Sequence, residues 1–230
     1  MSDPGLPSLV LASSSPRRRE LLAGLGLLFT VRPPTQVDET PHPGEAADEH
    51  VHRLALAKAM ADARPGELVL GADTVVVAHR EILGKPHGRQ EARAMLGSLA
   101  GREHTVHTGV ALYQPGAGPG GAARTATAVD SARVVIARMT AEEILWYVDT
   151  GEPLDKAGAY AVQGMGALFV EGVFGSYTTV VGLPLPVTRR LFGELGYELL
   201  AFQASGSWPG PKEQVGKSWP ALEQPVESRQ

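Results

Sequence analysis

The chain has 230 residues, 43% of them hydrophobic and 20% charged, a composition typical of a globular protein with one large domain or two small ones. Its net charge of −4 gives no reason to expect nucleic acid or an anionic membrane as a partner. The absence of cysteine excludes disulfides, thiolate nucleophiles and cysteine-based zinc sites. No signal-peptide pattern occurs and no apolar run approaches the roughly 18 residues of a membrane helix, so we expect a cytoplasmic protein.

The first elements are a strand at residues 9–12 and a helix at residues 16–25, with a polar junction between them. Ser15 suits the helix N-cap and Pro16 the first helical position. The free N–H groups of such a helix attract anions, and arginines there add donors for phosphate oxygens. The candidate phosphate ligands of this junction are Ser13, Ser15, Arg17 and Arg18. A capped surface helix with solvated arginines is an equally open alternative on this motif alone.

The rest of the chain alternates between strands and helices. In chain order, the patterns predict a strand at 29–31, a proline-rich loop, a helix at 45–64, strands at 68–78 and 82–83, a helix at 90–99, strands at 105–113 and 123–138, a helix at 140–151, strands at 168–173 and 177–181, and a helix at 185–195. This alternation predicts an α/β fold around a mixed, twisted sheet flanked by helices.

Two segments carry composition signals of their own. Residues 116–121 satisfy the glycine spacing of a dinucleotide-binding loop, but Pro119 interrupts them and a strand follows, so a hairpin loop is the better interpretation. After residue 202 several prolines lie among glycine, serine and glutamine. We therefore predict one domain at residues 1–202 and a tail without stable structure at residues 203–230.

Asp73 interrupts the apolar strand predicted at 68–78, on the same face as Val75 and Val77. A carboxylate buried there needs a cationic partner, a metal ion or a place at a cleft. Such surroundings can raise the pKa of a carboxyl group, which suits a general base. The alternative is a structural aspartate bound by backbone N–H groups.

Two lysines and a glutamate complete the set of unusual charges. Lys58 extends the inward apolar stripe of the helix at 45–64, although a lysine that only reaches out from the stripe's edge is the simpler interpretation. Lys85 stands between a glycine and a proline, which fix the backbone that aims its side chain but also occur in ordinary turns. Glu39 lies in the proline-rich loop as a second acidic candidate.

The segment 155–164 interleaves small residues with polar ones, so its backbone can approach a ligand while side chains contact the ligand's edge. Asp155 and Lys156 are candidate pocket residues. The amide of Gln163 can both donate and accept, as the edge of a uracil or thymine ring requires. Together with the groups above, this set fits a nucleoside triphosphate, whose charge is commonly neutralised by several cations and a divalent metal such as Mg²⁺.

A series of motifs over about residues 9–197 resembles the Maf family of nucleoside triphosphate pyrophosphatases, also described as septum-formation inhibitors. The matching stretches are residues 13–18, 37–39, 54–59, 71–74, 83–86, 101–104, 151–158, 163–164 and 181–184. The resemblance implies hydrolysis between the α and β phosphorus atoms, which gives a monophosphate and pyrophosphate. It also implies the α/β fold shared with inosine-triphosphate pyrophosphatases, with two lobes around a cleft, in a chain that is often a homodimer.

The same resemblance assigns roles to residues of this chain. Asp73 would activate water, and Glu39 with Asp73 would hold Mg²⁺ or Mn²⁺. The triphosphate would be held by Arg17, Arg18, Lys58 and Lys85, together with Ser13 and Ser15. Arg17, Thr74 and Gln163 match the positions that separate the dTTP/UTP branch from a branch that acts on 7-methyl-GTP.

We therefore expect a house-cleaning enzyme for dTTP, UTP and modified pyrimidine nucleotides, with no nucleic acid or membrane as partner. Two alternatives stay open at this point. One is a nucleotide-binding regulator of septum formation whose hydrolysis is incidental, and the other is the same reaction with a purine or methylated-base preference.

Overall fold

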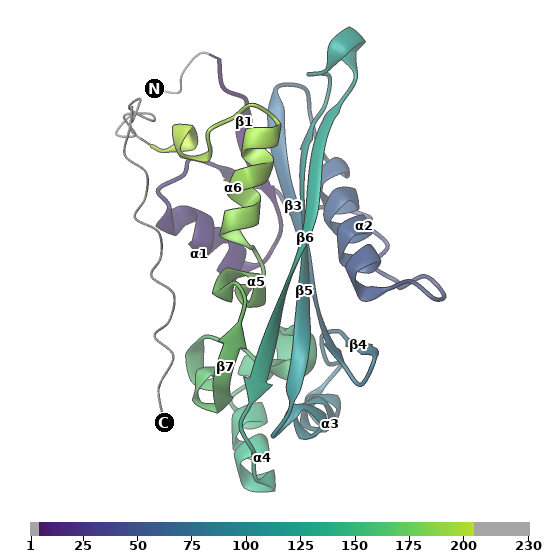
Figure 1. Ribbon diagram of the computed structural model, residues 1–230, viewed down its shortest axis with the longest axis vertical. Coiled ribbons are helices and arrows are strands. Elements are labelled where there is room, and N and C mark those ends of the chain that lie inside the picture. The colour runs from purple at the N-terminus through teal and green to yellow at the C-terminus, as the bar shows by residue number, and fades with distance from the viewer. Residues whose placement is uncertain (1–4, 205–230) are drawn as a thin grey trace, which may run out of the picture.

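A seven-stranded mixed sheet runs the length of the molecule in the computed structural model, which describes residues 5–204 (Figure 1). Its strands are β1 (Ser8–Ala12), β2 (Thr30–Val31), β3 (Glu67–Ala78), β4 (Glu81–Leu83), β5 (Glu103–Gln114), β6 (Arg124–Ile136) and β7 (Val170–Phe174). The strand order is β2-β1-β3-β5-β6-β7, with β4 beside β3. β1 runs parallel to β2 and β3, and all other pairs are antiparallel. The predicted α/β class with a mixed sheet is confirmed.

The helices cover the sheet in two groups that form two lobes (Figure 1). They are α1 (Pro16–Gly24), α2 (Ala47–Met60), α3 (Arg89–Leu99), α4 (Ala141–Asp149), α5 (Tyr177–Val181) and α6 (Leu185–Glu194). In the upper lobe α1 and α6 pack on one face of the sheet and α2 on the other, while α3 and α4 belong to the lower lobe. Within residues 5–204, every helix is too short or too polar to cross a membrane.

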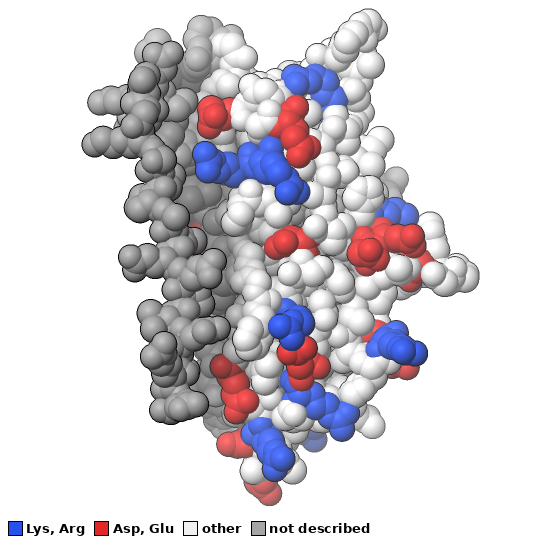
Figure 2. All heavy atoms as spheres, viewed as in Figure 1, with Lys and Arg blue, Asp and Glu red and all other residues white. Residues whose placement is uncertain are grey.

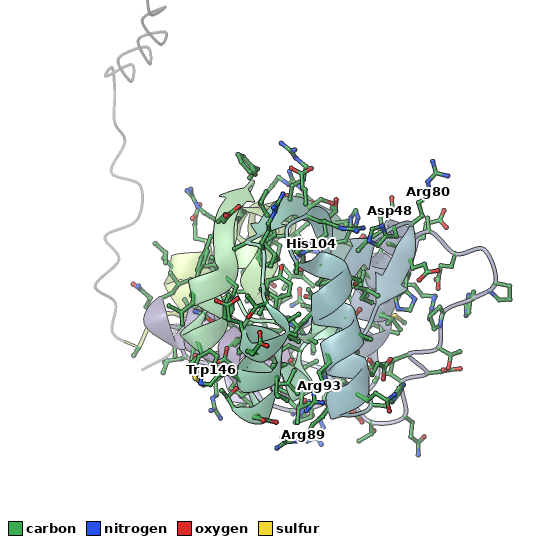
Figure 3. All side chains as sticks on the ribbon, turned by 90° about the horizontal axis from the view of Figure 1, so that it is seen from below. Asp48, Arg80, Arg89, Arg93, His104 and Trp146 are labelled. Atoms are coloured by element: carbon green, nitrogen blue, oxygen red, sulfur yellow. The ribbon has the colours of Figure 1, made fainter. Side chains whose placement is uncertain are left out.

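Each lobe has its own apolar core. The upper core includes Leu11, Leu70 and Phe192, and the lower core includes Leu96 and Tyr147. In the lower lobe the carboxylate of Asp149 on α4 also lies within ion-pair distance of Arg89 and Arg93 on α3. Figure 3, seen from below, labels these two arginines. Acidic and basic side chains are interspersed on the face seen in Figure 2, without a large patch of one sign.

One predicted element is wrong: residues 177–181 form the short helix α5 and not a strand. Its β-branched residues favour a strand, but hydrogen bonds to residues outside the segment decide otherwise. The hydroxyl of Thr179 donates to Asp130 of β6, and the hydroxyl of Thr178 accepts from the Leu185 N–H at 3.1 Å. Gly182, with a φ of 116°, then ends the helix. The other predicted elements are present, with ends shifted by a few residues.

The two segments with unusual composition have different outcomes. Residues 116–121 lie in the connection between β5 and β6 and no helix follows them, so the hairpin prediction is confirmed. Of the predicted tail, residues 205–230 lie outside the described residues. The first two tail residues are bonded to the domain, because the Gln203 amide donates to Leu25 O at 2.8 Å and the Ala204 N–H donates to Gly26 O at 3.1 Å.

Two glycines on neighbouring strands let α2 lie directly on the sheet. A Cβ atom at Gly71 would overlap the carbonyl oxygen of Ala55, and a Cβ atom at Gly109 would overlap that of Val51. These obstacles are helix backbone atoms, which cannot turn aside as a side chain would. The next inward residue of α2, Lys58, is therefore held close to β3.

We expect Gly71→Ala to lower the free energy of unfolding by about 3 kcal/mol, because the added methyl group forces α2 away from the sheet. Urea denaturation measures the change. The matched control is Gly97→Ala on the exposed side of α3, where a Cβ meets nothing within 4 Å. There alanine should raise the free energy of unfolding by about 0.5–1 kcal/mol. Equal effects at the two positions would contradict the close approach of α2.

Candidate functional site

One edge of β3 has no strand partner between the residues that pair with β1 and those that pair with β4. The last pair of β1 with β3 is Ala12 with Gly71, and the first pair of β4 with β3 on the same edge is Leu83 with Val76. The intervening stretch of β3, residues 72–75, has no strand partner on that edge. A cavity of about 820 Å³ opens at this gap, and both lobes contribute to its walls.

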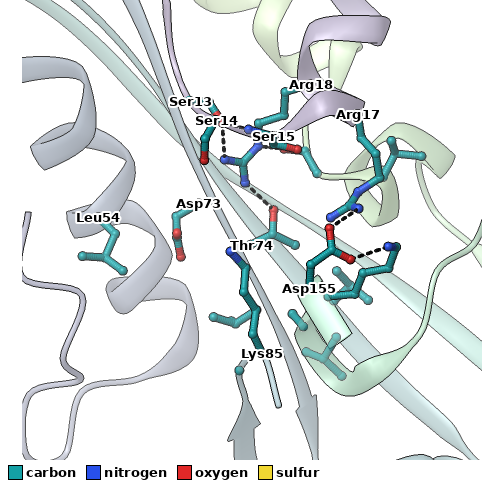
Figure 4. Close-up of a pocket in the computed structure, with 18 of the residues that line it drawn as sticks. Ser13, Ser14, Ser15, Arg17, Arg18, Leu54, Asp73, Thr74, Lys85 and Asp155 are labelled. Carbon is teal, nitrogen blue, oxygen red and sulfur yellow. Dashed lines mark hydrogen bonds and ion pairs between the residues drawn. The ribbon is translucent and has the colours of Figure 1, made fainter. Parts of the chain in front are cut away.

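All of the residues predicted to form the site line this one cavity. They are Ser13, Ser15, Arg17, Arg18, Glu39, Lys58, Asp73, Thr74, Lys85, Asp155, Lys156 and Gln163. Figure 4 shows several of them, among them Arg17, Asp73 and Lys85. The upper lobe supplies the junction after β1 and the inward face of α2, and the lower lobe supplies the turn after β4 and the segment after α4. The structure thus brings together residues up to 150 positions apart in the chain, while their individual roles stay predictions.

Asp73, Lys58 and Glu39 form a chain of ion pairs at the cavity wall. The Lys58 Nζ atom lies 2.7 Å from Asp73 Oδ1 and 2.8 Å from Glu39 Oε1. Lys58 and Asp73 are 8% and 7% exposed, so the lysine is not one that reaches out to solvent. Within residues 5–204 no backbone N–H group donates to Asp73, and its partner is the buried ammonium. Removing one member of such a pair leaves the other buried and unpaired, which typically costs about 3–5 kcal/mol.

The two carboxylates fit a divalent metal that arrives with a phosphate. Because Glu39 and Asp73 both contact the same ammonium, they are close enough to face one ligand. In the part of the chain that the structure describes, no group of three or more His, Asp or Glu side chains could hold a metal ion. Mg²⁺ is commonly bound by one or two carboxylates together with substrate phosphates and waters. This donor set therefore suits Mg²⁺ or Mn²⁺ completed by substrate oxygens.

Arg18 is used mainly to build the cavity wall. Its guanidinium donates four hydrogen bonds, of 2.8–3.2 Å, which connect the loop after β1, strand β3 and the end of α5. The acceptors are Ser13 Oγ, Ala72 O, Thr74 Oγ1 and Gly182 O. Burial lowers the pKa of this arginine, though a guanidinium stays charged in proteins. One of its five N–H groups is left for a ligand.

Asp155, in the lower lobe, connects its neighbour Lys156 with Arg17 on α1 of the upper lobe. Its Oδ1 atom lies 2.6 Å from Lys156 Nζ, and its Oδ2 atom lies 3.8 Å from Arg17 Nη1. Burial alone would raise the pKa of Asp155, but the hydrogen bond from Lys156 and the two positive charges outweigh burial and lower it. Lys85 has no ion pair with any residue in 5–204, and Figure 4 shows its side chain directed toward Thr74 and the centre of the cavity.

The cavity is positive although the chain is acidic. Among its lining residues the cations are Arg17, Arg18, Lys58, Lys85 and Lys156, and the carboxylates are Glu39, Asp73 and Asp155. This leaves a surplus of two positive charges, against a net charge of −4 for the whole chain. Low-dielectric walls with a surplus of positive charge concentrate the field and attract an anion.

The family model described as "Maf-like protein" matches residues 8–195. The chain belongs to this family. Among curated relatives in the Maf-like family, a dTTP/UTP pyrophosphatase of Myxococcus xanthus is 51% identical over 193 residues, which cover 83% of this chain and 94% of that protein. A dTTP/UTP pyrophosphatase of Anaeromyxobacter sp. is 53% identical over 192 residues, 83% of this chain and 91% of that protein. A dTTP/UTP pyrophosphatase of Moorella thermoacetica is 49% identical over 196 residues, which cover 84% of this chain and 98% of that protein.

Among solved structures, a nucleoside-triphosphatase, described also as a dITP/XTP pyrophosphatase, from Mycobacterium abscessus matches with 13% identity and a TM-score of 0.37. The match covers 82% of this chain and 97% of that chain. This likeness is too distant to bear on the site.

Sequence reasoning missed His50, which lines the cavity on α2 and is 4% exposed. It lies two helical turns before Lys58 on the same stripe, and that spacing could have indicated it. Its Nδ1 atom lies 2.9 Å from Glu45 Oε2, and Glu45 also accepts from Arg53 at 2.5 and 2.8 Å. The bonds from Arg53 contribute most to the low pKa of Glu45. This cluster fixes the segment between the Glu39 loop and α2.

Tyr160 is a second missed residue of the cavity wall, and His104 supports it from the core. The His104 Nε2 atom lies 2.8 Å from Tyr160 Oη. The His104 Nδ1 atom is the buried side-chain nitrogen or oxygen in residues 5–204 that lacks a partner. Burial lowers the pKa of His104 to about 4.

This low pKa predicts an acid-sensitive fold. The unfolded chain binds a proton at His104 with an ordinary pKa near 6.5, whereas the folded chain resists it until about pH 4. The free energy of unfolding should therefore fall as the pH falls from about 6.5 to 4, by about 3 kcal/mol from this group. His104→Gln keeps a partner for Tyr160 and should lack that part of the dependence. Parallel wild-type and variant curves in urea denaturation at several pH values would contradict the prediction.

Proposed function

We propose that this protein hydrolyses dTTP and UTP to the monophosphate and pyrophosphate, as a house-cleaning enzyme of the nucleotide pool that also acts on modified pyrimidine nucleotides. The observation that carries the proposal is a positive cavity built around a buried carboxylate, in a chain about half identical to dTTP/UTP pyrophosphatases over most of its length. A nucleoside triphosphate has the charge that this cavity attracts.

The mechanism follows from the placement of the charges. Arg17, Lys58 and Lys85 bind the phosphates from both lobes, and this fixes the α-phosphorus relative to Asp73. Asp73 takes a proton from a water molecule, whose oxygen attacks the α-phosphorus as the bond to the bridging oxygen breaks and pyrophosphate leaves. When bound by Glu39 and Asp73, Mg²⁺ or Mn²⁺ would neutralise charge on the phosphate oxygens. Catalysis here comes from positioning and charge stabilisation, without a covalent intermediate.

Base selectivity is assigned to the lower-lobe side of the cavity. Within residues 5–204 the Gln163 amide makes no hydrogen bond to the protein, so it is free to donate to and accept from a uracil or thymine edge. Thr74 Oγ1 is already bonded to Arg18 and to Thr108 Oγ1, at 3.1 and 2.9 Å, so it shapes the wall. We assign selectivity to Gln163 directly, and to Arg17 and Thr74 through the shape of the cavity. A cytoplasmic location and a homodimer are further parts of the proposal.

A pyrophosphate-release assay over a panel of nucleotides tests the proposed function. We expect dTTP and UTP to be hydrolysed faster than dCTP and 7-methyl-GTP, because the Gln163 amide matches the uracil and thymine edges. Chelation of divalent metal should abolish the activity, and added Mg²⁺ or Mn²⁺ should restore it. The fastest turnover with 7-methyl-GTP, or release of orthophosphate in place of pyrophosphate, would contradict the assignment.

Asp73→Asn should lower turnover of dTTP by at least about a hundredfold, the scale of a lost general base. The control is Asp149→Asn, the same change at a half-exposed carboxylate that pairs with Arg89 and does not line the cavity. That variant should keep wild-type turnover. If Asp73→Asn keeps it as well, Asp73 is not the base. Tight nucleotide binding with negligible wild-type turnover would instead support a nucleotide-binding regulator.

A further inference from the structure

Tyr147 and Glu152 form a hydrogen-bonded pair behind the cavity, and neither residue lines it. The Tyr147 hydroxyl donates to Glu152 Oε1 at 2.8 Å. Tyr147 is fully buried at the end of α4, and burial together with this hydrogen bond raises its pKa. The mechanism above uses neither residue. Burying a tyrosine hydroxyl beside a carboxylate costs desolvation free energy. The groups that the pair binds therefore indicate its role.

The pair binds both ends of the segment 161–166. At one end the Ala161 N–H donates to the Tyr147 hydroxyl oxygen at 3.1 Å. At the other end the Gly166 N–H donates to Glu152 Oε1 at 2.9 Å, and the Met165 N–H donates to Glu152 Oε2 at 3.0 Å. Hydrogen bonds to a charged acceptor are stronger than neutral ones, so the carboxylate is the main anchor.

Two glycines allow the segment to wrap this closely around the pair. A Cβ atom at Gly164 would overlap Glu152 Oε2, and a Cβ atom at Gly166 would overlap the Tyr147 hydroxyl oxygen. Gly164 also has a φ of +68°, a conformation that other residues rarely adopt. The segment is therefore shaped by the pair and not only in contact with it.

Gln163 lies between the two anchored ends and lines the cavity, and its amide makes no hydrogen bond within residues 5–204. We propose that Glu152 is a positioning residue for base selectivity, which holds Gln163 in place with Tyr147 behind it. This inference rests on the proposed function. The Glu152 carbonyl oxygen also accepts from Lys156 at 2.8 Å, but that contact involves the backbone and survives a side-chain substitution.

The variant Glu152→Gln isolates the anchor. Glutamine has nearly the same shape but replaces one acceptor oxygen with an NH₂ group, which would face N–H and O–H donors and cannot accept from them. At least one of the three donors then loses its acceptor, so the anchor at residues 165–166 should weaken and Gln163 should lose its fixed place. Phosphate binding and the Asp73 base lie elsewhere, so turnover should change less than selectivity does.

The experiment is a competition between dTTP and dCTP in one reaction, followed by quantification of both monophosphates. The ratio of the two products reports the ratio of kcat/KM values and does not depend on how much of the enzyme is folded. We expect the selectivity ratio to fall at least about tenfold in Glu152→Gln, since discrimination by a hydrogen-bonding site depends on its geometry. Tyr147→Phe should lower it less. The control Glu194→Gln, on the surface of α6, should leave it unchanged.

A double variant tests the route of the effect. If Glu152 acts through Gln163, then Glu152→Gln combined with Gln163→Ala should have the same selectivity as Gln163→Ala alone. Additive losses would show a different route and overturn the inference, as would a wild-type ratio in Glu152→Gln. If Glu152→Gln does not fold, an unchanged ratio in Tyr147→Phe overturns it. Failure of the wild-type enzyme to release pyrophosphate from dTTP or UTP is a different result, which contradicts the proposed function itself.

Discussion

Helix α2 lies against β3 and β5 at a distance that only glycine permits, and the candidate site depends on this contact. Gly71 and Gly109 remove the two methyl groups that would push the helix away. The inward stripe of α2 therefore continues from apolar residues into Lys58, whose ammonium reaches Asp73 at 2.7 Å. A buried ion pair of this kind adds little stability to a fold. It places a carboxylate and an ammonium, both shielded from water, beside the space that a substrate would fill.

The second condition is an interruption of the sheet. β1 is short and β4 begins late, so the middle of β3 presents an unpaired edge between two lobes with separate cores. Asp73 and Thr74 are adjacent on β3, so their side chains point to opposite faces of the sheet. Because the cavity lies at the edge of β3, both side chains line it. Cations from both lobes then converge on it. This is how an acidic chain forms a cavity with positive charge.

Several polar residues in or behind the cavity wall hold other residues in place. The Arg18 guanidinium donates four hydrogen bonds to other groups of the protein. Glu45 fixes the segment before α2, and Glu152 anchors the segment that carries Gln163. Each one satisfies backbone or side-chain groups that would otherwise be buried without partners. A site held by such contacts keeps its geometry before a ligand binds, which reduces the cost of ordering at the moment of binding.

Local patterns in the sequence predicted nearly every element, the placement of Asp73 and Lys58 among apolar neighbours, and the family to which the chain belongs. Periodicity, capping and motif spacing are properties of consecutive residues, so they are visible without a fold. Tertiary structure alone decided that residues 177–181 form a helix, that Arg18 is bound mostly by the protein, and that Glu152 and Tyr147 hold the Gln163 segment. Those outcomes depend on contacts between residues that the sheet and its crossovers bring together, and no local pattern specifies them.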